Sequence, residues 1–252
     1  MHSQTGQKGR LAQLVQSICL TSRGSLVRIQ YLPRKPQISL RLFLCLRILN
    51  FYSGRPLKLR KQFIICRVNM ETILEQVKDY ADKAHGEQLR KYTPDRYIVH
   101  PIRVMLICRE YTDDIAILSA ALLHDVLEDT PVQKEELKEF LMKVMSPEQA
   151  ITTLRYVMEL TDVFTKEDYP ALNRKRRKLK EVERLGKVSK ESQTIKYADI
   201  IDNSNEIVDH DPNFAPVFLL ECRAILSKML EGNPELYQRA IKTVEEALKK
   251  RG

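Results

Sequence analysis

The 252-residue chain has 43% apolar residues, enough for one large domain or two small ones. Its formal charge of +9 is unevenly placed, because 13 of the 42 Lys and Arg, and none of the 33 Asp and Glu, fall in residues 1–69. Residues 70–252 therefore hold 29 basic and 33 acidic groups, a net of −4, which removes the main argument for a nucleic-acid-binding domain there.

The first 69 residues differ in pattern from the rest of the chain. An apolar cluster at residues 38–49 is too short and too charged to span a bilayer. Three interpretations are open: a stretch outside the functional protein, with Met70 as the true start, an organellar transit peptide, or a basic arm that binds nucleic acid or membrane. We prefer the first, because the pattern changes abruptly at Met70. Residues 1–69 are then poorly ordered or not part of the functional protein, and residues 70–252 form the working domain.

Helical signals are regular after Met70. Apolar residues recur at three- and four-residue spacing through residues 73–84 and predict a first helix that ends near Gly86. Proline and capping residues mark later helices over Ile98–Cys108, from Asp113 or Asp114 to Thr130-Pro131, from Ser146-Pro147, over Pro170–Leu185, Ser189–Val208 and Asp211–Leu230, and from Asn233-Pro234. With only eight glycines, no tryptophan and no strand alternation, the pattern predicts an all-α bundle of roughly nine helices.

The five cysteines show no CxxC spacing and an odd total, so a disulfide framework or a thiolate zinc site is not expected. This usage is typical of a reducing compartment, and we expect a cytoplasmic protein without a membrane partner. The oligomeric state is left open.

The stretch Leu122–Thr130 places one imidazole and three carboxylates within six residues, at the end of an apolar run. Because residues four apart share a helix face, His124 is expected above Glu128 and Asp125 above Asp129. The simpler interpretation is an acidic helix end with a satisfied histidine. We favour a functional site, because the apolar neighbours bury this segment and unpaired charge is costly near a core.

A metal ion held by His124 and Asp125 needs further ligands, and His100 and Asp199 stand on other predicted helices. Imidazole and carboxylate donors with open positions suit Mn²⁺, Fe²⁺ or other first-row ions better than a closed structural zinc site. His85 and His210 are the other histidines after Met70. Taken singly, each of these residues is more often a satisfied or exposed side chain than a ligand, so His100 and Asp199 are candidates.

The order of His100, then His124-Asp125, then Asp199 resembles the H…HD…D arrangement of HD-superfamily metal-dependent phosphohydrolases. The flanking residues look more narrowly like the hydrolase domain of RelA/SpoT enzymes and their small stand-alone homologues. The stretches that carry this likeness are His85–Lys91, Tyr97–Pro101, His124–Thr130, and Lys196–Asp199 with Asn203. The likeness runs from about Met70 to the C-terminus and lacks the synthetase half of the long family members.

The resemblance implies a helical, Mn²⁺-dependent hydrolase that removes the 3′-pyrophosphate from guanosine 3′,5′-bis(diphosphate), a guanine nucleotide alarmone. Carried over from the family, the metal ligands would be His100, His124, Asp125 and Asp199, which should converge on one ion, and His85 and His210 should not bind it. The resemblance also implies roles for further residues. Glu128 and Asp129 match the acidic pair beside the attacking water, Arg90 and Lys91 the basic pair that faces the nucleotide, and Asn203 the asparagine one turn beyond the last ligand.

Two departures weaken the substrate assignment: Ala171 stands where the family has a lysine facing substrate phosphate, and Ile200 where it has a basic residue. Two alternatives therefore stay open: an HD phosphohydrolase for another nucleotide or related phosphorylated small molecule, and a catalytically silent nucleotide-binding module. The intact set of ligands and acidic residues disfavours the second. Compensating cations are available at Lys166, Arg174 and Arg176, unless residues 174–180 are only a solvated helix face.

Overall fold

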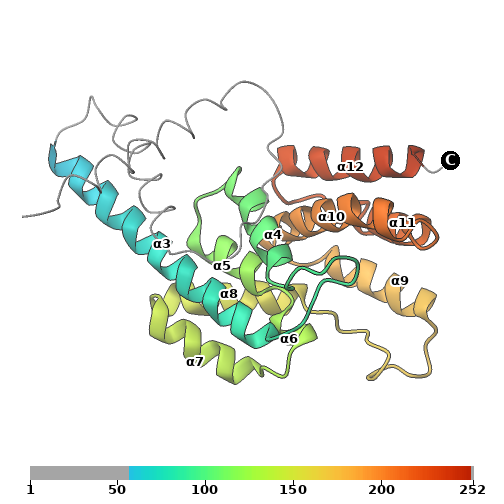
Figure 1. The fold of residues 1–252 in the computed structure, drawn as a ribbon, viewed down its shortest axis with the longest axis horizontal. Helices are drawn as coiled ribbons and strands as arrows, with labels where there is room; N and C mark the ends of the chain where they lie inside the picture. Colours follow the sequence, from blue (N-terminus) through green and yellow to red (C-terminus); the bar gives the residue numbers. More distant parts are fainter. Residues whose placement is uncertain (1–56, 251–252) are drawn as a thin grey trace, which may run out of the picture. The chain divides into compact units, whose positions relative to one another are not determined.

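The computed structural model describes residues 57–250, with side chains from residue 68 onward (Figure 1). The predicted all-α fold is confirmed: within that range the chain forms helices and no strand, apart from one isolated bridge between Leu89 and Arg96. The helices are α3 (Leu57–His85), α4 (Val99–Arg109), α5 (Ile115–Leu123), α6 (Val126–Asp129), α7 (Lys134–Val144), α8 (Pro147–Leu160), α9 (Arg174–Leu185), α10 (Lys190–His210), α11 (Ala215–Leu226) and α12 (Pro234–Lys249).

The expected boundary between residues 69 and 70 falls inside α3, which continues through Met70 without a break. Residues 1–56 of the expected N-terminal segment lie outside the described residues. No helix of the described part is long and apolar enough to cross a membrane.

Capping side chains fix several helix starts that the sequence predicts. The Asp114 side chain accepts a hydrogen bond from the Ala116 amide at 2.8 Å, and Asn233 caps α12 in the same way through the Leu236 amide at 3.0 Å. Ser146 begins α8 with a full capping box, in which its hydroxyl and the Gln149 side chain satisfy each other's backbone amides. Such caps stabilise a helix by about 1 kcal/mol each and set where it enters the bundle.

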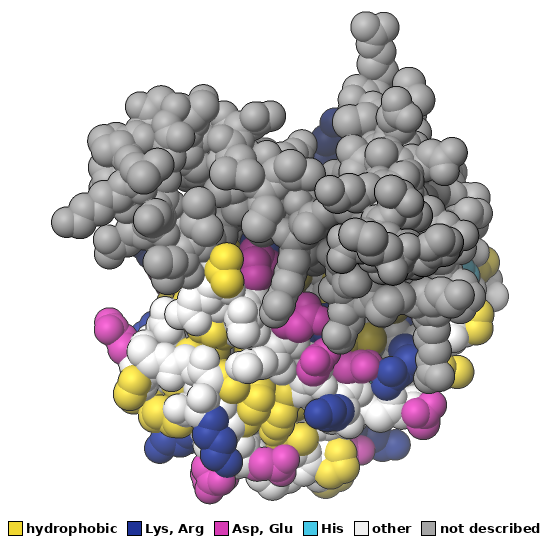
Figure 2. Space-filling view, turned by 60° about the vertical axis from the view of Figure 1, so that its left-hand side comes forward, with side chains coloured by type: hydrophobic (Ala, Val, Ile, Leu, Met, Phe, Trp, Pro, Cys, Tyr) yellow, Lys and Arg dark blue, Asp and Glu magenta, His cyan; other side chains and the backbone are white. Residues whose placement is uncertain are grey.

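The core lies around α5 and α10. Every residue of α5 from Ala116 to Leu123 is buried, and this helix packs on α3, α4 and α8. Helix α10 packs along α12 and also contacts α4 and α5, as the ribbon in Figure 1 shows for α10 and α12. Burial of each large apolar side chain contributes roughly 1.5–3 kcal/mol, so α4, α5 and α10 form a rigid frame. On the face seen in Figure 2, acidic and basic side chains are interspersed among apolar ones.

The sequence predicts one helix through the central motif, but in the structure that helix is interrupted. Helix α5 ends at Leu123, His124 and Asp125 form a turn, and α6 is a single helical turn that begins at Val126. Both residues of the turn keep right-handed helical dihedrals, and the Asp129 amide donates to the Asp125 carbonyl at 2.8 Å. At this turn the adjacent side chains of His124 and Asp125 approach each other, with 3.1 Å between His124 Nε2 and Asp125 Oδ2.

Two further helix predictions differ from the structure. Helix α7 lies in a segment for which no helix was named from the sequence, although Leu137 and Leu141 form a buried pair at four-residue spacing. Helix α9 begins at Arg174 rather than Pro170, because the Asn173 side chain caps it by accepting from the Arg176 amide at 3.0 Å. The segment between α8 and α9 is consequently a loop, and it forms one wall of the cleft described below.

Candidate functional site

Two helices and one turn bring the four expected ligand side chains to one place. His100 comes from the first turn of α4, His124 and Asp125 from the turn between α5 and α6, and Asp199 from the middle of α10. His100 Nε2 lies 3.2 Å from Asp199 Oδ1 and 3.6 Å from Asp125 Oδ2. His124 Nε2 lies 3.1 Å from Asp125 Oδ2 and 3.7 Å from Asp199 Oδ1. We call these four side chains the central cluster.

The outer nitrogen of each imidazole is held by an acceptor. His124 Nδ1 lies 2.9 Å from the Ala121 carbonyl and His100 Nδ1 lies 2.7 Å from Asp202 Oδ2. A carbonyl and an ionised carboxylate only accept hydrogen bonds, so both Nδ1 atoms carry the proton. In the neutral rings the two Nε2 atoms then present lone pairs to the centre. His124 Nε2 is buried and makes no well-directed hydrogen bond within the described part of the chain.

The carboxylates of the central cluster also have outer partners. Tyr97 donates its hydroxyl to Asp125 Oδ2 at 2.7 Å. Asp199 is held on both oxygens, since Asn203 Nδ2 donates to Oδ1 at 2.6 Å and Lys196 Nζ lies 2.8 Å from Oδ2. Burial alone would raise the pKa of Asp199, but the Lys196 ammonium and the two imidazoles outweigh it and hold the pKa well below its usual range.

Electrostatics in the cluster favour a cation between the imidazoles and carboxylates. Burial opposes protonation of His100 and His124, yet the surrounding aspartates outweigh burial and raise the pKa of both rings, that of His124 strongly. Protons therefore compete with any cation for the two Nε2 atoms. Any metal ion that binds there replaces them, as is general for histidine ligands.

The donor set fits a divalent ion. Donor atoms that each lie about 2.1 Å from one ion are roughly 3.0–3.4 Å from one another in octahedral or tetrahedral coordination. The separations between donor atoms in the cluster, 3.1 to 3.7 Å, are close to that range. Donor atoms of His100, His124 and Asp125 all lie within 4.8 Å of one another, as a metal site requires. The described residues thus contain a His/Asp cluster with the geometry and chemistry to hold a divalent metal.

Glu128 and Asp129 lie beside the cluster and line the cleft next to it. Burial, and then repulsion from Asp162, raise the pKa of Glu128 to about 7. Burial and the neighbouring Asp125 also raise the pKa of Asp129, although the Tyr97 hydroxyl partly offsets this. Glu128 accepts a hydrogen bond from the Asp162 amide at 3.2 Å, which ties it to the loop between α8 and α9.

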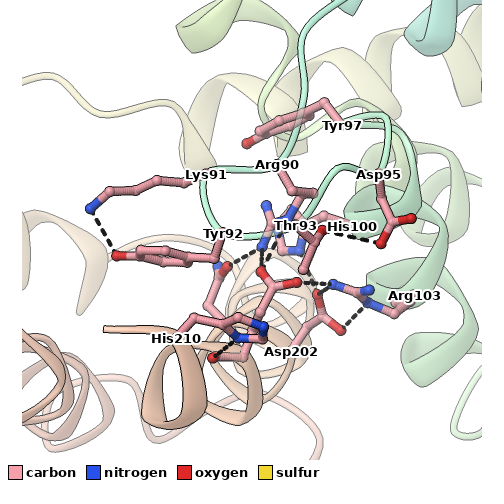
Figure 3. A network of polar contacts seen from close by, with 12 residues as sticks. Arg90, Lys91, Tyr92, Thr93, Asp95, Tyr97, His100, Arg103, Asp202 and His210 are labelled. Atoms are coloured by element: carbon pink, nitrogen blue, oxygen red, sulfur yellow. Dashed lines mark hydrogen bonds and ion pairs between the residues drawn. The ribbon is translucent and has the colours of Figure 1, made fainter. Parts of the chain in front are cut away.

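The three residues expected to face a nucleotide occupy different surroundings. Asn203 reaches the cluster through Asp199, and its carbonyl oxygen accepts from Arg90 at 3.0 Å. The Arg90 side chain is only 8% exposed and is paired with Glu206. Lys91 is 70% exposed and extends away from His100 to the Tyr92 hydroxyl and Asp211 (Figure 3). The structure therefore joins Asn203 and Arg90 to the cluster and leaves Lys91 outside it.

The remaining two histidines lie beyond the central cluster. His85 is buried and stacks on Tyr97, with ring centroids 4.4 Å apart, while its Nδ1 pairs with Gln88. His210 is exposed at the end of α10, where its Nδ1 bonds to the Glu206 carbonyl. Neither belongs to the group of His100, His124 and Asp125.

Two adjoining hollows lie at the site, and one of them is lined by the cluster. This hollow, of about 220 Å³, is lined by His100, Asp125 and Asp199 and also by apolar residues that include Ile200 and Phe218. The other, of about 320 Å³, shares Glu128, Asp129, Asp162 and Lys178 with it and is bordered by cations, which we call the basic rim: Lys166, Arg174, Arg177 and Lys178. Arg176, a candidate compensating cation, does not line the hollow, and Ala171 is exposed.

Several residues of the site were given no role by the sequence analysis. Tyr97 and Lys196 belong to stretches that carry the family likeness, and their contacts to Asp125 and Asp199 are new. Asp202 follows Asp199 by three residues, so helical spacing could have placed it on the same face of α10. Arg103 and Asp162 had no local signal, because their partners are distant in sequence.

Comparisons with known proteins agree with this geometry. Residues 97–204 match the model of the HD domain family. A guanosine-3′,5′-bis(diphosphate) 3′-pyrophosphohydrolase of Aquifex aeolicus is 46% identical over 66 residues, 26% of this chain and 9% of that protein. A probable enzyme of the same name from Mycoplasma pneumoniae is 30% identical over 142 residues, 54% of this chain and 18% of that protein. The chain thus matches only about a tenth to a fifth of the length of these relatives.

A solved structure supports the same fold. It is described as a metazoan ortholog of SpoT that hydrolyzes ppGpp and plays a role in starvation responses. It superposes with a TM-score of 0.58 at 24% sequence identity and covers 71% of this chain and 96% of its own. At that identity the likeness shows the fold, and it agrees with the HD domain match over residues 97–204.

Proposed function

We propose that this chain, whose residues 97–204 match the HD domain, is a Mn²⁺-dependent phosphohydrolase that removes the 3′-diphosphate of guanosine 3′,5′-bis(diphosphate). The observation that carries the proposal is the convergence of His100, His124, Asp125 and Asp199, with the bare Nε2 of His124 facing the two carboxylates. Such a buried set of opposed donors is costly unless a cation fills it.

The central cluster would hold the ion through two imidazole nitrogens and two carboxylates, a mixed donor set that suits Mn²⁺ and related first-row ions. When bound, such an ion polarises phosphoryl oxygens and lowers the pKa of water toward neutrality. The chain's own part is to position these donors: the Ala121 carbonyl and Asp202 hold the imidazoles, and Tyr97, Lys196 and Asn203 hold the carboxylates.

Glu128 is the proposed proton acceptor for the attacking water. A base whose pKa is about 7 is substantially ionised at neutral pH and still takes up a proton readily. In the proposed reaction the water oxygen adds to the phosphorus attached to the 3′ oxygen. The bond from phosphorus to that oxygen breaks, its electron pair goes to the 3′ oxygen, and a proton completes guanosine 5′-diphosphate. The other product is inorganic diphosphate.

The basic rim supports a substrate with several phosphates. The hollow beside Glu128 and Asp129 is bordered by Lys166, Arg174 and Lys178. These cations can bind the negative phosphate groups of a substrate. Relatives named as guanosine-3′,5′-bis(diphosphate) 3′-pyrophosphohydrolases are 46% and 40% identical over short matched segments, which supports the same substrate class.

A second candidate is an HD phosphohydrolase for another nucleotide or phosphoester. Three observations favour it: position 171 offers only an exposed alanine, Ile200 gives the hollow an apolar wall, and Arg90 is occupied by Glu206. These changes bear on recognition of the substrate and leave the central cluster untouched. A silent nucleotide-binding module is a weaker candidate, because it has no physical need for the complete cluster with Glu128 and Asp129.

Incubation of the purified full chain with Mn²⁺ and a panel of phosphorylated nucleotides tests the proposal. The panel holds guanosine 3′,5′-bis(diphosphate), deoxynucleoside triphosphates, cyclic nucleotides and dinucleotide polyphosphates, with products separated by anion exchange. We expect guanosine 5′-diphosphate and diphosphate from the first, and no turnover with a chelator or in Asp125→Asn. Faster cleavage of another member would favour the second candidate, and binding without cleavage of any member would favour the silent module.

A further inference from the structure

Asp202 touches one residue of the central cluster from outside. It lies on α10, three residues after Asp199, and is 7% exposed. Its Oδ2 is 2.7 Å from Nδ1 of His100, which is itself 1% exposed. The contact joins two buried groups that are 102 residues apart in sequence, so it depends on the packing of α4 against α10.

Arg103 holds this carboxylate in a fixed direction. Its Nε donates to Asp202 Oδ1 at 2.6 Å and its Nη2 to Oδ2 at 3.0 Å, a two-point contact from α4 to α10 (Figure 3). The same Nη2 donates to Glu206 at 3.2 Å. Two parallel bonds from a planar guanidinium fix the carboxylate plane as well as its position. Arg103 and the His100 ring stand one turn apart on α4, so both contacts are set by one rigid helix.

The two imidazoles of the cluster are held differently. His124 donates to the carbonyl of Ala121 within its own segment, whereas His100 meets a side chain from another helix. A carboxylate is a stronger acceptor than a carbonyl, so it makes the opposite ring nitrogen more basic. Arg103 donates to both oxygens of Asp202, which is the arrangement that suits an ionised carboxylate.

We infer that Asp202 is a positioning residue for the metal site: it keeps the proton of His100 on Nδ1 and points Nε2 at Asp125 and Asp199. The inference rests on the metal site of the proposed function. The competing explanation is that Asp202 serves only the contact of α4 with α10 through Arg103. The two explanations differ in what they predict for the affinity of the ion.

Asp202→Asn tests the inference, with Glu206→Gln as its matched control. Both changes replace a carboxylate on α10 that pairs with Arg103, but only Asp202 touches His100, whereas Glu206 also pairs with Arg90. Calorimetric titration of the full chain with Mn²⁺ should show an affinity roughly 10–100-fold weaker for Asp202→Asn, the usual effect of losing such an outer partner. Glu206→Gln should stay close to wild type. Thermal unfolding of both metal-free variants measures any loss of helix packing.

Equal Mn²⁺ affinities for wild type and Asp202→Asn would overturn the inference, as would an equal loss in both variants. If Asp202→Asn does not yield folded protein, Arg103→Gln takes its place, since it frees the carboxylate without removing it. Its Mn²⁺ affinity should then fall by a smaller factor, and an unchanged affinity would refute the role of Asp202. Failure of the wild-type chain to bind Mn²⁺ would instead remove the metal site of the proposed function.

Discussion

The central cluster and the basic rim lie side by side but are built in opposite ways. His100, His124 and Asp199 are 1%, 4% and 6% exposed, and each has an outer partner that fixes its direction. Lys166 and Arg174 of the rim are exposed, and Arg174 is paired with Glu221 across the surface. Buried polar groups need defined partners, whereas exposed cations are solvated and can follow a ligand.

This difference suggests a division of labour. The rigid cluster would decide whether an ion is held and whether phosphate chemistry occurs, and the rim would decide how tightly a charged substrate binds. Glu128 and Asp129 stand between the two, since they line both hollows. Substitutions in the three places should therefore have separable effects on the ion, on turnover and on substrate affinity.

The largest effect is expected in the cluster. Asp125→Ala should lose the bound ion and with it all measurable hydrolysis, because the two buried imidazoles would lose one of the two carboxylates that they share. Mn²⁺ at 100 times its dissociation constant stabilises a binding protein by about 2.7 kcal/mol, so it should raise the Tm of wild type and not of the variant. Asp209→Ala, at an exposed position of α10, is the control. A normal Mn²⁺ affinity in Asp125→Ala would contradict the site.

The next effect separates chemistry from metal binding. Glu128→Gln together with Asp129→Asn keeps side-chain shape but removes the candidate proton acceptors. Turnover should fall by roughly 10² to 10⁴, the usual scale for a lost acid–base group, while metal content stays normal. Steady-state rates and metal analysis on the same preparation check this. Full activity in the double variant would mean that the pair is only an acidic cluster at the end of α6.

The pH dependence of ion binding should be smaller but clear. The raised pKa values of His100 and His124 mean that protons compete with the ion, so Mn²⁺ affinity should rise with pH. A roughly 10- to 100-fold gain between pH 6 and 8 is expected if one proton is displaced over part of that range. The stability of the ion-free protein should change with pH in the opposite direction. A raised histidine pKa stabilises the fold fully below about pH 6.5, and that stability is lost as pH rises through the folded pKa.

Titrations with Mn²⁺ at pH 6, 7 and 8 check the trend in affinity. Tm measured with and without the ion at the same pH values checks the trend in stability. The Tm of the ion-free chain should fall as the affinity rises. If the Mn²⁺ affinity did not change over this range, the ion would not be displacing protons from the imidazoles.

The residues of the central cluster could be predicted from the sequence better than the residues around them. The order of His100, His124-Asp125 and Asp199 named the four side chains that meet, and helical periodicity predicted the all-α fold, which the structure confirms. The break at His124 was not predictable from periodicity, because no Pro or Gly marks a turn between Leu123 and Val126. Pairings such as Arg90 with Glu206 join residues 116 apart, and no local pattern encodes them.

The smallest effect is expected at the basic rim. Lys166→Gln with Arg174→Gln removes two exposed cations from the hollow beside Glu128, so KM for a multiply phosphorylated substrate should rise roughly tenfold, with kcat changed much less. Lys175→Gln with Arg176→Gln removes the same charge from the start of the same helix but not from the hollow, and it should leave KM near wild type. If both double variants raised KM equally, net charge would be the cause. If the rim variant lost kcat instead, the rim would act in the chemical step, and its separation from the central cluster would be wrong.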